Sequence, residues 1–239
     1  MKLLLHACCA PCSAPILEWL INNNIQPSIF YYNPNIYPQK EYEIRRNEIE
    51  RYCKKLNINF IEGDYNHEEW LNHVRGLENE PERGSRCLEC FKLRLAATAK
   101  VAEKEGFDTI ASSLSSSRWK SIDQIDTAGN LAVENIQGVD YLARNWRKGG
   151  LQHRRNELLK ENGFCYKASP RLCEEFFPTR CYASVVLNEG VYDALIIDLG
   201  SGVGNNWWCV VYPPLCFANS NNVAYKSRIV EIIKKYFGG

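Results

Sequence analysis

Short apolar segments with strand character alternate with helix-like segments through the first half of the chain. The expected strands are residues 2–7, 28–32, 59–62 and 108–112. Apolar residues at helical spacing predict helices over 14–20 and 41–56, and a third that ends near Gly106. Such alternation is typical of βαβ units, so the sequence predicts an α/β domain with a doubly wound parallel sheet.

Polar and sulfur-containing residues follow these expected strands where each strand ends. Cys8, Cys9 and Cys12 lie in the turn after the first strand, Asn33 follows the second and Asp64 follows the third. The carboxyl ends of parallel strands meet at one edge of the sheet, which is where ligands of doubly wound proteins bind. We therefore expect the functional site at this edge.

The cysteines indicate a metal site rather than a disulfide framework. The chain has 11 cysteines among 239 residues, an odd number at uneven spacing. Cys8 and Cys9 are adjacent and do not easily bridge each other, and the run before them is too short for a secretory signal. No segment is long and apolar enough to span a membrane. We therefore expect a cytoplasmic, reducing location and no membrane partner.

Two cysteine pairs are the best candidate ligands. Cys87 and Cys90 form a C-x-x-C that is expected just before a helix, and Cys8 and Cys9 lie at the carboxyl edge of the sheet. Thiolates are the ligands of iron–sulfur clusters, and a four-iron cluster takes four of them. A tetrahedral thiolate site suits zinc as well, so the residues alone leave both metals open.

A basic segment with aromatic residues is a candidate nucleic-acid interface. The net charge of +1 creates no global field, so any nucleic-acid binding requires a local patch. Residues 141–160 contain six Lys or Arg and one acidic residue. The expected phosphate contacts are Arg118, Lys120, Arg144, Arg147, Lys148, Arg154 and Arg155. The expected base-stacking residues are Tyr31 and Trp146. A solvated charged face is the alternative interpretation of the same residues.

The character of the chain changes near residue 160. Strand-like segments at 181–187, 191–199 and 207–212 are separated by glycine-rich turns, and a final helix is expected at 225–236. The sequence thus predicts two domains, residues 1–160 and residues 161–239, of which the second is a small strand-rich lobe.

Six segments that occur in order carry a family resemblance. They are LLLHACCAPCS, FYYNPNIYPQKEYEIR, IEGDYN, RCLECFKLRLAATA, TIASSLSSSRWKS and NWRKGGLQHRR. Through them, the region from Met1 to about Gly163 resembles the QueH-type epoxyqueuosine reductase family. The resemblance implies a nucleotide α-hydrolase-like fold. It also implies reduction of epoxyqueuosine to queuosine at the anticodon wobble position of tRNA, with electrons from an unidentified donor.

The same resemblance implies roles for particular residues. The ligands of a [4Fe-4S] cluster map onto Cys8, Cys9, Cys87 and Cys90. Cys12 would help to bind a second, mononuclear iron, and Asp64 is a weaker candidate for that site because a turn carboxylate explains it equally well. An iron with an open position would polarise the epoxide C–O bond.

The C-terminal part departs from this family. The reductases close with Cys-Gly-Cys, whereas this chain reads CYKASPRLCEEFFPTRCY after Phe164, which leaves electron delivery open. Residues 176–217 instead resemble the C-terminal part of stage II sporulation protein R, and this likeness covers about 161–239. The chain is then a genuine fusion or a chimeric join.

Two other functions fit the same residues. One is a signalling or interaction protein of the sporulation type whose reductase half is vestigial and inactive. The other is a zinc-stabilised RNA-binding module without redox activity. The identity of the metal separates the second alternative from a reductase.

Overall fold

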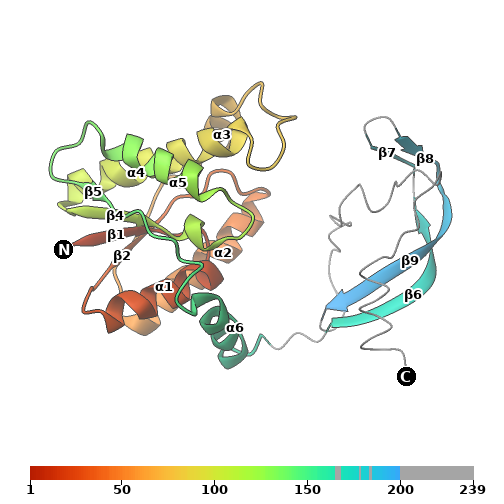
Figure 1. The fold of residues 1–239 in the computed structure, drawn as a ribbon, viewed down its shortest axis with the longest axis horizontal. Helices are drawn as coiled ribbons and strands as arrows, with labels where there is room; N and C mark the ends of the chain where they lie inside the picture. Colours follow the sequence, from red (N-terminus) through yellow and green to blue (C-terminus); the bar gives the residue numbers. More distant parts are fainter. Residues whose placement is uncertain (165–167, 178, 183–184, 200–239) are drawn as a thin grey trace. The chain divides into compact units, whose positions relative to one another are not determined.

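The structure, a computed structural model, describes residues 1–164, 168–177, 179–182 and 185–199 (Figure 1). Contacts divide the chain into two units, Met1–Phe164 and Cys165–Gly239. The predicted boundary after residue 160 falls near the end of the last helix of the first unit, α6 (Leu151–Glu161).

The first unit is organised around a parallel sheet of five strands in the order β3-β2-β1-β4-β5. The strands are β1 (Leu3–His6), β2 (Ser28–Tyr31), β3 (Phe60–Glu62), β4 (Thr109–Ser112) and β5 (Asp140–Tyr141). The strand order reverses on either side of β1, so the switch point of the sheet lies between β1 and β4. In doubly wound proteins the carboxyl edge at this point forms the ligand crevice.

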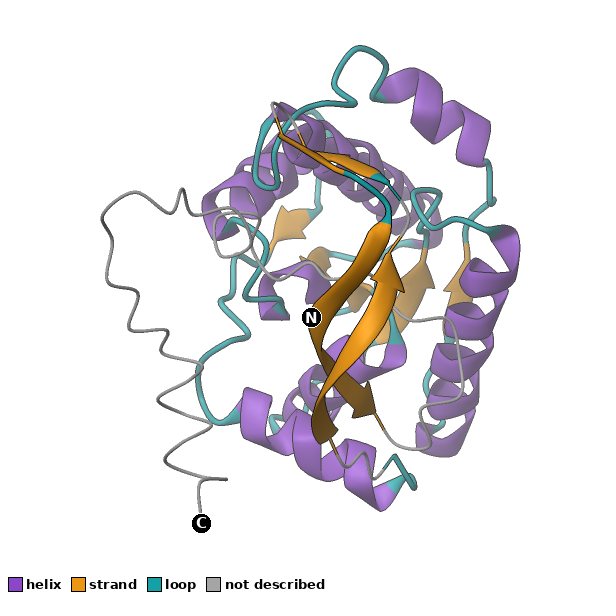
Figure 2. Ribbon diagram, turned by 90° about the vertical axis from the view of Figure 1, so that its right-hand side faces the viewer, coloured by secondary structure: helices purple, strands orange, loops and turns teal. Residues whose placement is uncertain are grey.

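Alternate side chains of β1 enter separate cores on the two faces of the sheet. Leu3 and Leu5 pack with α1 (Ala10–Asn22), α2 (Gln39–Leu56) and α6, whereas Leu4 packs with α4 (Ser85–Glu105). α5 (Ile122–Val133) lies on the same side of the sheet as α4. Figure 2 shows helices on both sides of the strands. Two short helices, α3 (His67–His73) and η1 (Ser113–Ser116), complete the unit. The predicted doubly wound α/β fold is confirmed.

The first helix begins earlier than the sequence predicts. The predicted start was Ala14, but α1 begins at Ala10 with Pro11 in its first turn and Pro15 inside it. Proline fits the first turn because those N–H groups have no partner within the helix. Pro15 has no N–H to donate to the carbonyl of Pro11, so the helix lacks that one hydrogen bond. As a consequence Cys12 lies on the helix and not in the turn before it.

The fourth helix also begins earlier than expected. Cys87 and Cys90 were expected just before this helix, but α4 starts at Ser85 and includes both residues. The other predicted strand and helix boundaries of the first unit agree with the structure to within two residues. The helices α3, α5 and α6 were not predicted.

The second unit contains two antiparallel pairs in its described part. β6 (Ala168–Phe177) pairs with β9 (Gly190–Leu199), and β7 (Arg180–Tyr182) pairs with β8 (Val185–Leu187). The predicted strand 191–199 is confirmed, whereas predicted strand 181–187 is wrong because this segment forms the β7–β8 pair. The predicted strand 207–212 and helix 225–236 lie outside the described residues. The described part of this unit is strand-rich, as expected.

A search of the described residues for helices that could cross a bilayer finds none with the required length and apolarity.

The contact between α5 and β5 gives a test of the packing. A Cβ atom added to Gly129 would lie 2.3–2.5 Å from ring atoms of Tyr141, whose hydroxyl donates to Asp126 at 3.0 Å. We predict that Gly129→Ala destabilises the protein by about 1–3 kcal/mol, because the overlap exceeds the helix-propensity gain of about 1 kcal/mol. Denaturant unfolding measures this.

The matched control is Asn130→Ala at the exposed neighbouring position of α5. This change gains helix propensity without a clash, so stability equal to or above that of the wild type is expected. Equal stabilisation by both variants would contradict the packing argument.

Candidate metal centre and adjoining pocket

Three cysteine thiols converge where β1 passes into α1. The sulfur atoms of Cys8, Cys9 and Cys12 all lie within 4.8 Å of one another, and those of Cys8 and Cys9 are 3.9 Å apart. Cys9 is the N-cap of α1 in an extended conformation, and Cys12 is in the first turn. The group therefore lies at a helix N-terminus, where backbone N–H groups favour negative charge.

The three thiols differ in acidity because they share hydrogen bonds. Hydrogen bonds from Cys12 and Cys9 hold the pKa of Cys8 well below its usual range, assisted by the Ser113 hydroxyl and the charge of Lys120. The hydrogen bond to Cys8 is the main cause that raises the pKa of Cys12 to about 12. Hydrogen bonds to Cys12 and Cys8 also raise the pKa of Cys9. The turn thus stabilises negative charge on sulfur before any metal binds.

The second cysteine pair lies on the first two turns of α4. Cys90 is buried at 8% exposure, and Cys87 packs with Cys8 against the same apolar cluster. The members of that cluster are Phe91, Leu95, Leu114, Ile125 and Ala128. Neither Cys87 nor Cys90 belongs to the group of three sulfurs within 4.8 Å. The fold therefore brings both cysteine segments to one apolar cluster, with the first segment already assembled.

Hydrogen bonds from neighbouring strands fix the backbone that carries Cys8. Asn33 donates to the carbonyl oxygen of Ala7 at 2.9 Å, and the N–H of Cys8 donates to Ser113 Oγ at 3.0 Å. Ser113 also donates to Cys8 Sγ at 3.3 Å. Beneath them, buried His6 lies between Ser112 Oγ (3.0 Å) and the carbonyl oxygen of Tyr32 (3.2 Å). The position of the Cys8 sulfur atom is therefore set by the turn after β1 and by the residues that follow β2 and β4.

A pocket of about 600 Å³ opens beside Cys12. Its lining residues are Cys12, Ser117, Arg118, Trp119, Gly150, Gln152, His153, Arg155 and Asn156. Trp119 is 64% exposed. The volume is in the range of pockets that hold a nucleoside-sized ligand. Cys12 thus belongs both to the sulfur group and to the pocket wall.

The loop that carries Trp119 is held at its backbone. Arg83 donates to the carbonyl oxygens of Arg118 (2.9 Å) and Trp119 (3.1 Å), and Arg147 donates to that of Lys120. These contacts use the backbone and leave the Trp119 ring exposed. A fixed loop with an exposed indole is suited to stacking on a planar group.

The predicted phosphate-binding residues fall into two groups. Arg118, Lys120, Arg147, Lys148 and Arg155 form no ion pair within the described part of the chain. Arg118 and Arg155 line the pocket. Their charges are available for an anionic ligand.

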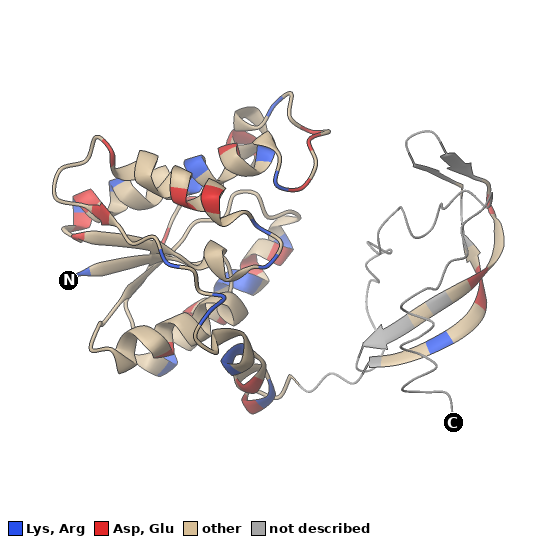
Figure 3. Ribbon diagram, viewed as in Figure 1, with Lys and Arg blue, Asp and Glu red and all other residues tan. Residues whose placement is uncertain are grey.

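Arg154 and Arg144 have partners within the protein. Arg154 pairs with Glu18 at 2.7 Å and with Glu157 and Glu161, which fastens α6 to α1. Figure 3 shows basic and acidic positions side by side on α6. Arg144 lies over the ring of Trp19 at 3.7 Å. The phosphate contact expected of Arg154 stays a prediction, but three carboxylates already pair with its guanidinium.

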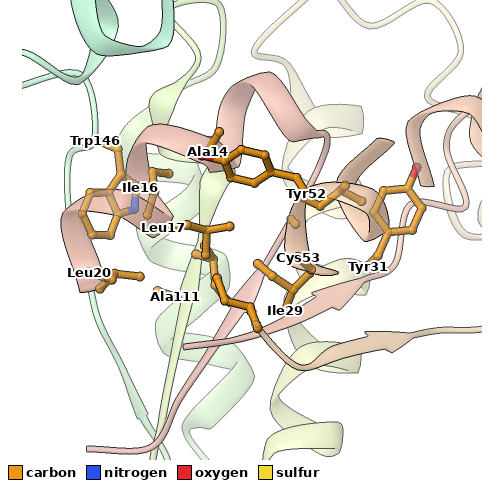
Figure 4. Close-up of a cluster of buried hydrophobic side chains, with 14 of the residues drawn as sticks. Ala14, Ile16, Leu17, Leu20, Ile29, Tyr31, Tyr52, Cys53, Ala111 and Trp146 are labelled. Carbon is orange, nitrogen blue, oxygen red and sulfur yellow. The ribbon is translucent and has the colours of Figure 1, made fainter. Parts of the chain in front are cut away.

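Tyr31 and Trp146 are core residues, so their predicted role in base stacking is wrong. Tyr31 is 0% exposed and Trp146 is 1% exposed (Figure 4). Tyr31 donates to the carbonyl oxygen of Tyr42, and Trp146 packs edge-on against Trp19. The alternation of β2 and the apolar surface of α1 required these rings inside.

Asp64 is exposed and lies outside the sulfur group. Ser113, Arg83 and Arg94 were not among the expected site residues. Ser113 directly follows the fourth strand, and Arg94 follows Cys90 by one helical turn, so position relative to the cysteines could have indicated both. The role of Arg83 depends on a long-range contact that carries no local signal.

The fold and the site define a class: doubly wound α/β proteins with a group of thiols at the carboxyl edge of the sheet. The family model of epoxyqueuosine reductase QueH matches residues 3–169, and the chain belongs to this family. A second family model, stage II sporulation protein R, matches residues 120–222. Both predicted resemblances are confirmed, and their ranges overlap between residues 120 and 169.

Individual relatives agree with the family assignment. The chain is 46% identical to epoxyqueuosine reductase QueH of Acinetobacter baylyi, over 68% of this chain and 75% of the relative. It is 45% identical to the QueH of Haemophilus influenzae, over 68% of this chain and 66% of the relative. It is 35% identical to the QueH of Streptococcus pyogenes, over 77% of this chain and 69% of the relative. The chain thus spans about two-thirds to three-quarters of the lengths of these relatives.

The buried His6 makes stability depend on pH. Burial, with a smaller contribution from the charge of Arg94, lowers the pKa of His6 to about 3. An unfolded histidine titrates near 6.5, so between these values the unfolded chain binds a proton that the folded chain does not. We predict that the metal-free protein loses about 1–2 kcal/mol of unfolding free energy between pH 7 and pH 5.

Chemical unfolding of His6→Asn provides the control. Asparagine keeps a polar contact to Ser112 but does not titrate. The variant should therefore have a lower unfolding free energy at pH 7 and lose less of it on acidification. An unchanged pH dependence in this variant would show that His6 is not responsible.

Proposed function

We propose that this chain is an iron–sulfur reductase that converts epoxyqueuosine to queuosine in the anticodon of tRNA. Membership of the QueH family supports the reaction class. The observation that carries the proposal is the group of three thiols at the carboxyl edge of the sheet, with Cys12 in the wall of a pocket. The cytoplasm is the compartment we propose, because free thiols persist under reducing conditions.

The donor set suits an iron–sulfur centre. Cys8 and Cys9 from one segment and Cys87 and Cys90 from the other would supply four thiolates. Cys12 would assist a second, mononuclear iron, with Asp64 as the weaker candidate. When bound, such a centre supplies electrons one at a time, and an iron with an open position polarises a C–O bond.

The reaction removes one oxygen atom from the substrate. Both C–O bonds of the epoxide break, a C=C bond forms, and two electrons and two protons are consumed while water leaves. An external electron donor must supply the electrons. Cys12 is the thiol that joins the sulfur group to the pocket, so it is our candidate for the residue next to the reacting epoxide.

The remaining pocket residues suit a nucleotide. Arg118 and Arg155 have no carboxylate partner in the described part of the chain, so they can bind phosphate oxygens. Trp119 offers an exposed ring on a loop fixed by Arg83 and Arg147. This combination of positive charge and an aromatic surface is typical of binding to single-stranded RNA.

Turnover on defined RNA tests the proposal. Anaerobically reconstituted full-length protein is incubated with tRNA that contains epoxyqueuosine and with a chemical reductant, and the nucleosides are analysed by mass spectrometry. Loss of one oxygen atom from the modified nucleoside is expected, with Cys12→Ala strongly impaired. Iron-loaded, reduced protein that leaves the epoxide intact would contradict the proposal.

RNA binding gives a second prediction that does not depend on turnover. Trp119→Ala should weaken binding of an anticodon stem-loop by about 1–3 kcal/mol, because one base loses its stacking partner. Trp119→Phe should retain most of the affinity. Fluorescence anisotropy measures both.

Arg155→Gln should reduce the slope of log K against log salt by about 0.7–0.9, the effect of one lost phosphate contact. The matched control is Arg51→Gln on α2, whose guanidinium pairs with Glu48 at 3.0 Å. An equal reduction of the slope in Arg155→Gln and Arg51→Gln would show a nonspecific charge effect.

An interaction role for the second unit has separate support. The sporulation family model covers part of this unit. Leu172, Phe176 and Val191 are 77%, 60% and 63% exposed, and the strand register places them on one face of the β6–β9 pair. A fully metal-loaded chain without turnover would favour this function, with a vestigial reductase half.

A further inference from the structure

Arg94 is a buried cation without a counter-charge. It lies within α4, is 3% exposed and forms no ion pair with a described carboxylate. Its Nη2 donates to Asn33 Oδ1, whereas its Nε has no hydrogen-bond partner. The guanidinium group stays protonated in proteins, so the charge is buried together with an unsatisfied donor.

The arginines of α2 differ from Arg94 in this respect. Arg45, Arg46 and Arg51 on α2 pair with carboxylates at 2.7–3.0 Å, although they are more exposed than Arg94. Burial of an unpaired charge costs several kcal/mol, and buried charges in proteins are therefore usually paired. The described carboxylates provide no negative partner for Arg94.

Arg94 lies between the two cysteine segments. Cys90 precedes it by four residues on α4, so their side chains share one helix face with Cβ atoms about 5–6 Å apart. On its other side, Asn33 accepts from Arg94 and donates to the carbonyl of Ala7, the residue before Cys8. The guanidinium is thus linked to the first segment through Asn33, and its residue lies one helical turn from Cys90 of the second segment.

We propose that Arg94 is the built-in counter-charge of an anionic thiolate-ligated metal centre formed by the two cysteine segments. This inference rests on the proposed function, because that centre supplies the negative charge. Arg94 acts here as a positioning residue: through Asn33 it fixes the turn of Cys8, and through its charge it favours negative charge at the centre.

The charge has a consequence for reduction. A centre held by four thiolates is anionic, and each added electron increases its negative charge. A nearby cation in a medium of low dielectric constant therefore stabilises the reduced form more than the oxidised form. Removal of the Arg94 charge should make reduction harder.

Two substitutions separate charge from packing. Arg94→Met keeps an unbranched side chain of similar length without the charge, and Arg94→Lys keeps the charge. Arg46→Met is the matched control, because it removes an arginine that already pairs with Glu50 and Glu62. Each full-length variant is measured metal-free by denaturant unfolding, and after anaerobic reconstitution by iron and sulfide content and by redox titration.

The expected results differ between the metal-free and the loaded protein. Metal-free Arg94→Met should unfold at a denaturant concentration no lower than the wild type, because an unpaired buried charge has been removed. Loaded Arg94→Met should show at least a tenfold shift toward the oxidised form at a fixed potential, about 59 mV for one electron. In Arg94→Lys and Arg46→Met, the ratio of oxidised to reduced centre at the same potential should stay within threefold of the wild-type ratio.

The outcomes distinguish this inference from the proposed function. A wild-type chain that binds no iron contradicts the proposed function. An iron-loaded wild type whose potential and iron content match those of Arg94→Met contradicts the counter-charge role alone. If Arg94→Met does not fold, Arg94→Gln replaces it, and an unshifted potential in that variant overturns the inference equally.

Discussion

The geometry of the site depends on two hydrogen bonds that hold the turn after β1. Asn33 donates to the carbonyl oxygen of Ala7, and the N–H of Cys8 donates to Ser113. Since Asn33 follows β2 and Ser113 follows β4, these bonds tie the turn to both neighbouring strands of the sheet. The three thiols converge because this backbone cannot move independently of the sheet, whose two faces are buried in separate cores.

The sequence predicts this framework because its signals are local and periodic. Leu3 to Leu5 form a continuous apolar run, as expected for a strand buried on both faces, and the residues after each strand must gather at one edge. The cysteines of that edge were therefore identified correctly as neighbours. The start of α1 was not predicted correctly, because Pro11 and Pro15 each fit the first turn of a helix and only the packing of the folded chain decides between the two starts.

Burial explains the remaining differences. Tyr31 and Trp146 have amphipathic rings that suit either a core or an RNA surface, and the choice depends on long-range packing against Tyr42 and Trp19. The sequence suggests that Arg154 is an unpaired surface cation. In the structure its guanidinium pairs with Glu18, which is distant in the chain. Arg94 differs from Arg154 because it is buried. The counter-charge role that we propose for it depends on the neighbouring cysteine segments, which the local sequence pattern does not reveal.

Metal analysis of anaerobically reconstituted protein tests the central claim, that two cysteine segments hold one iron–sulfur centre. We expect about four irons and four acid-labile sulfides per chain, and their loss in Cys87→Ser. Cys53→Ser is the control, because Cys53 is fully buried in the core of α1 and α2 and should leave the metal content unchanged. Stoichiometric zinc without sulfide, or iron content unaffected by Cys87→Ser, would show that the two cysteine segments do not hold one iron–sulfur centre.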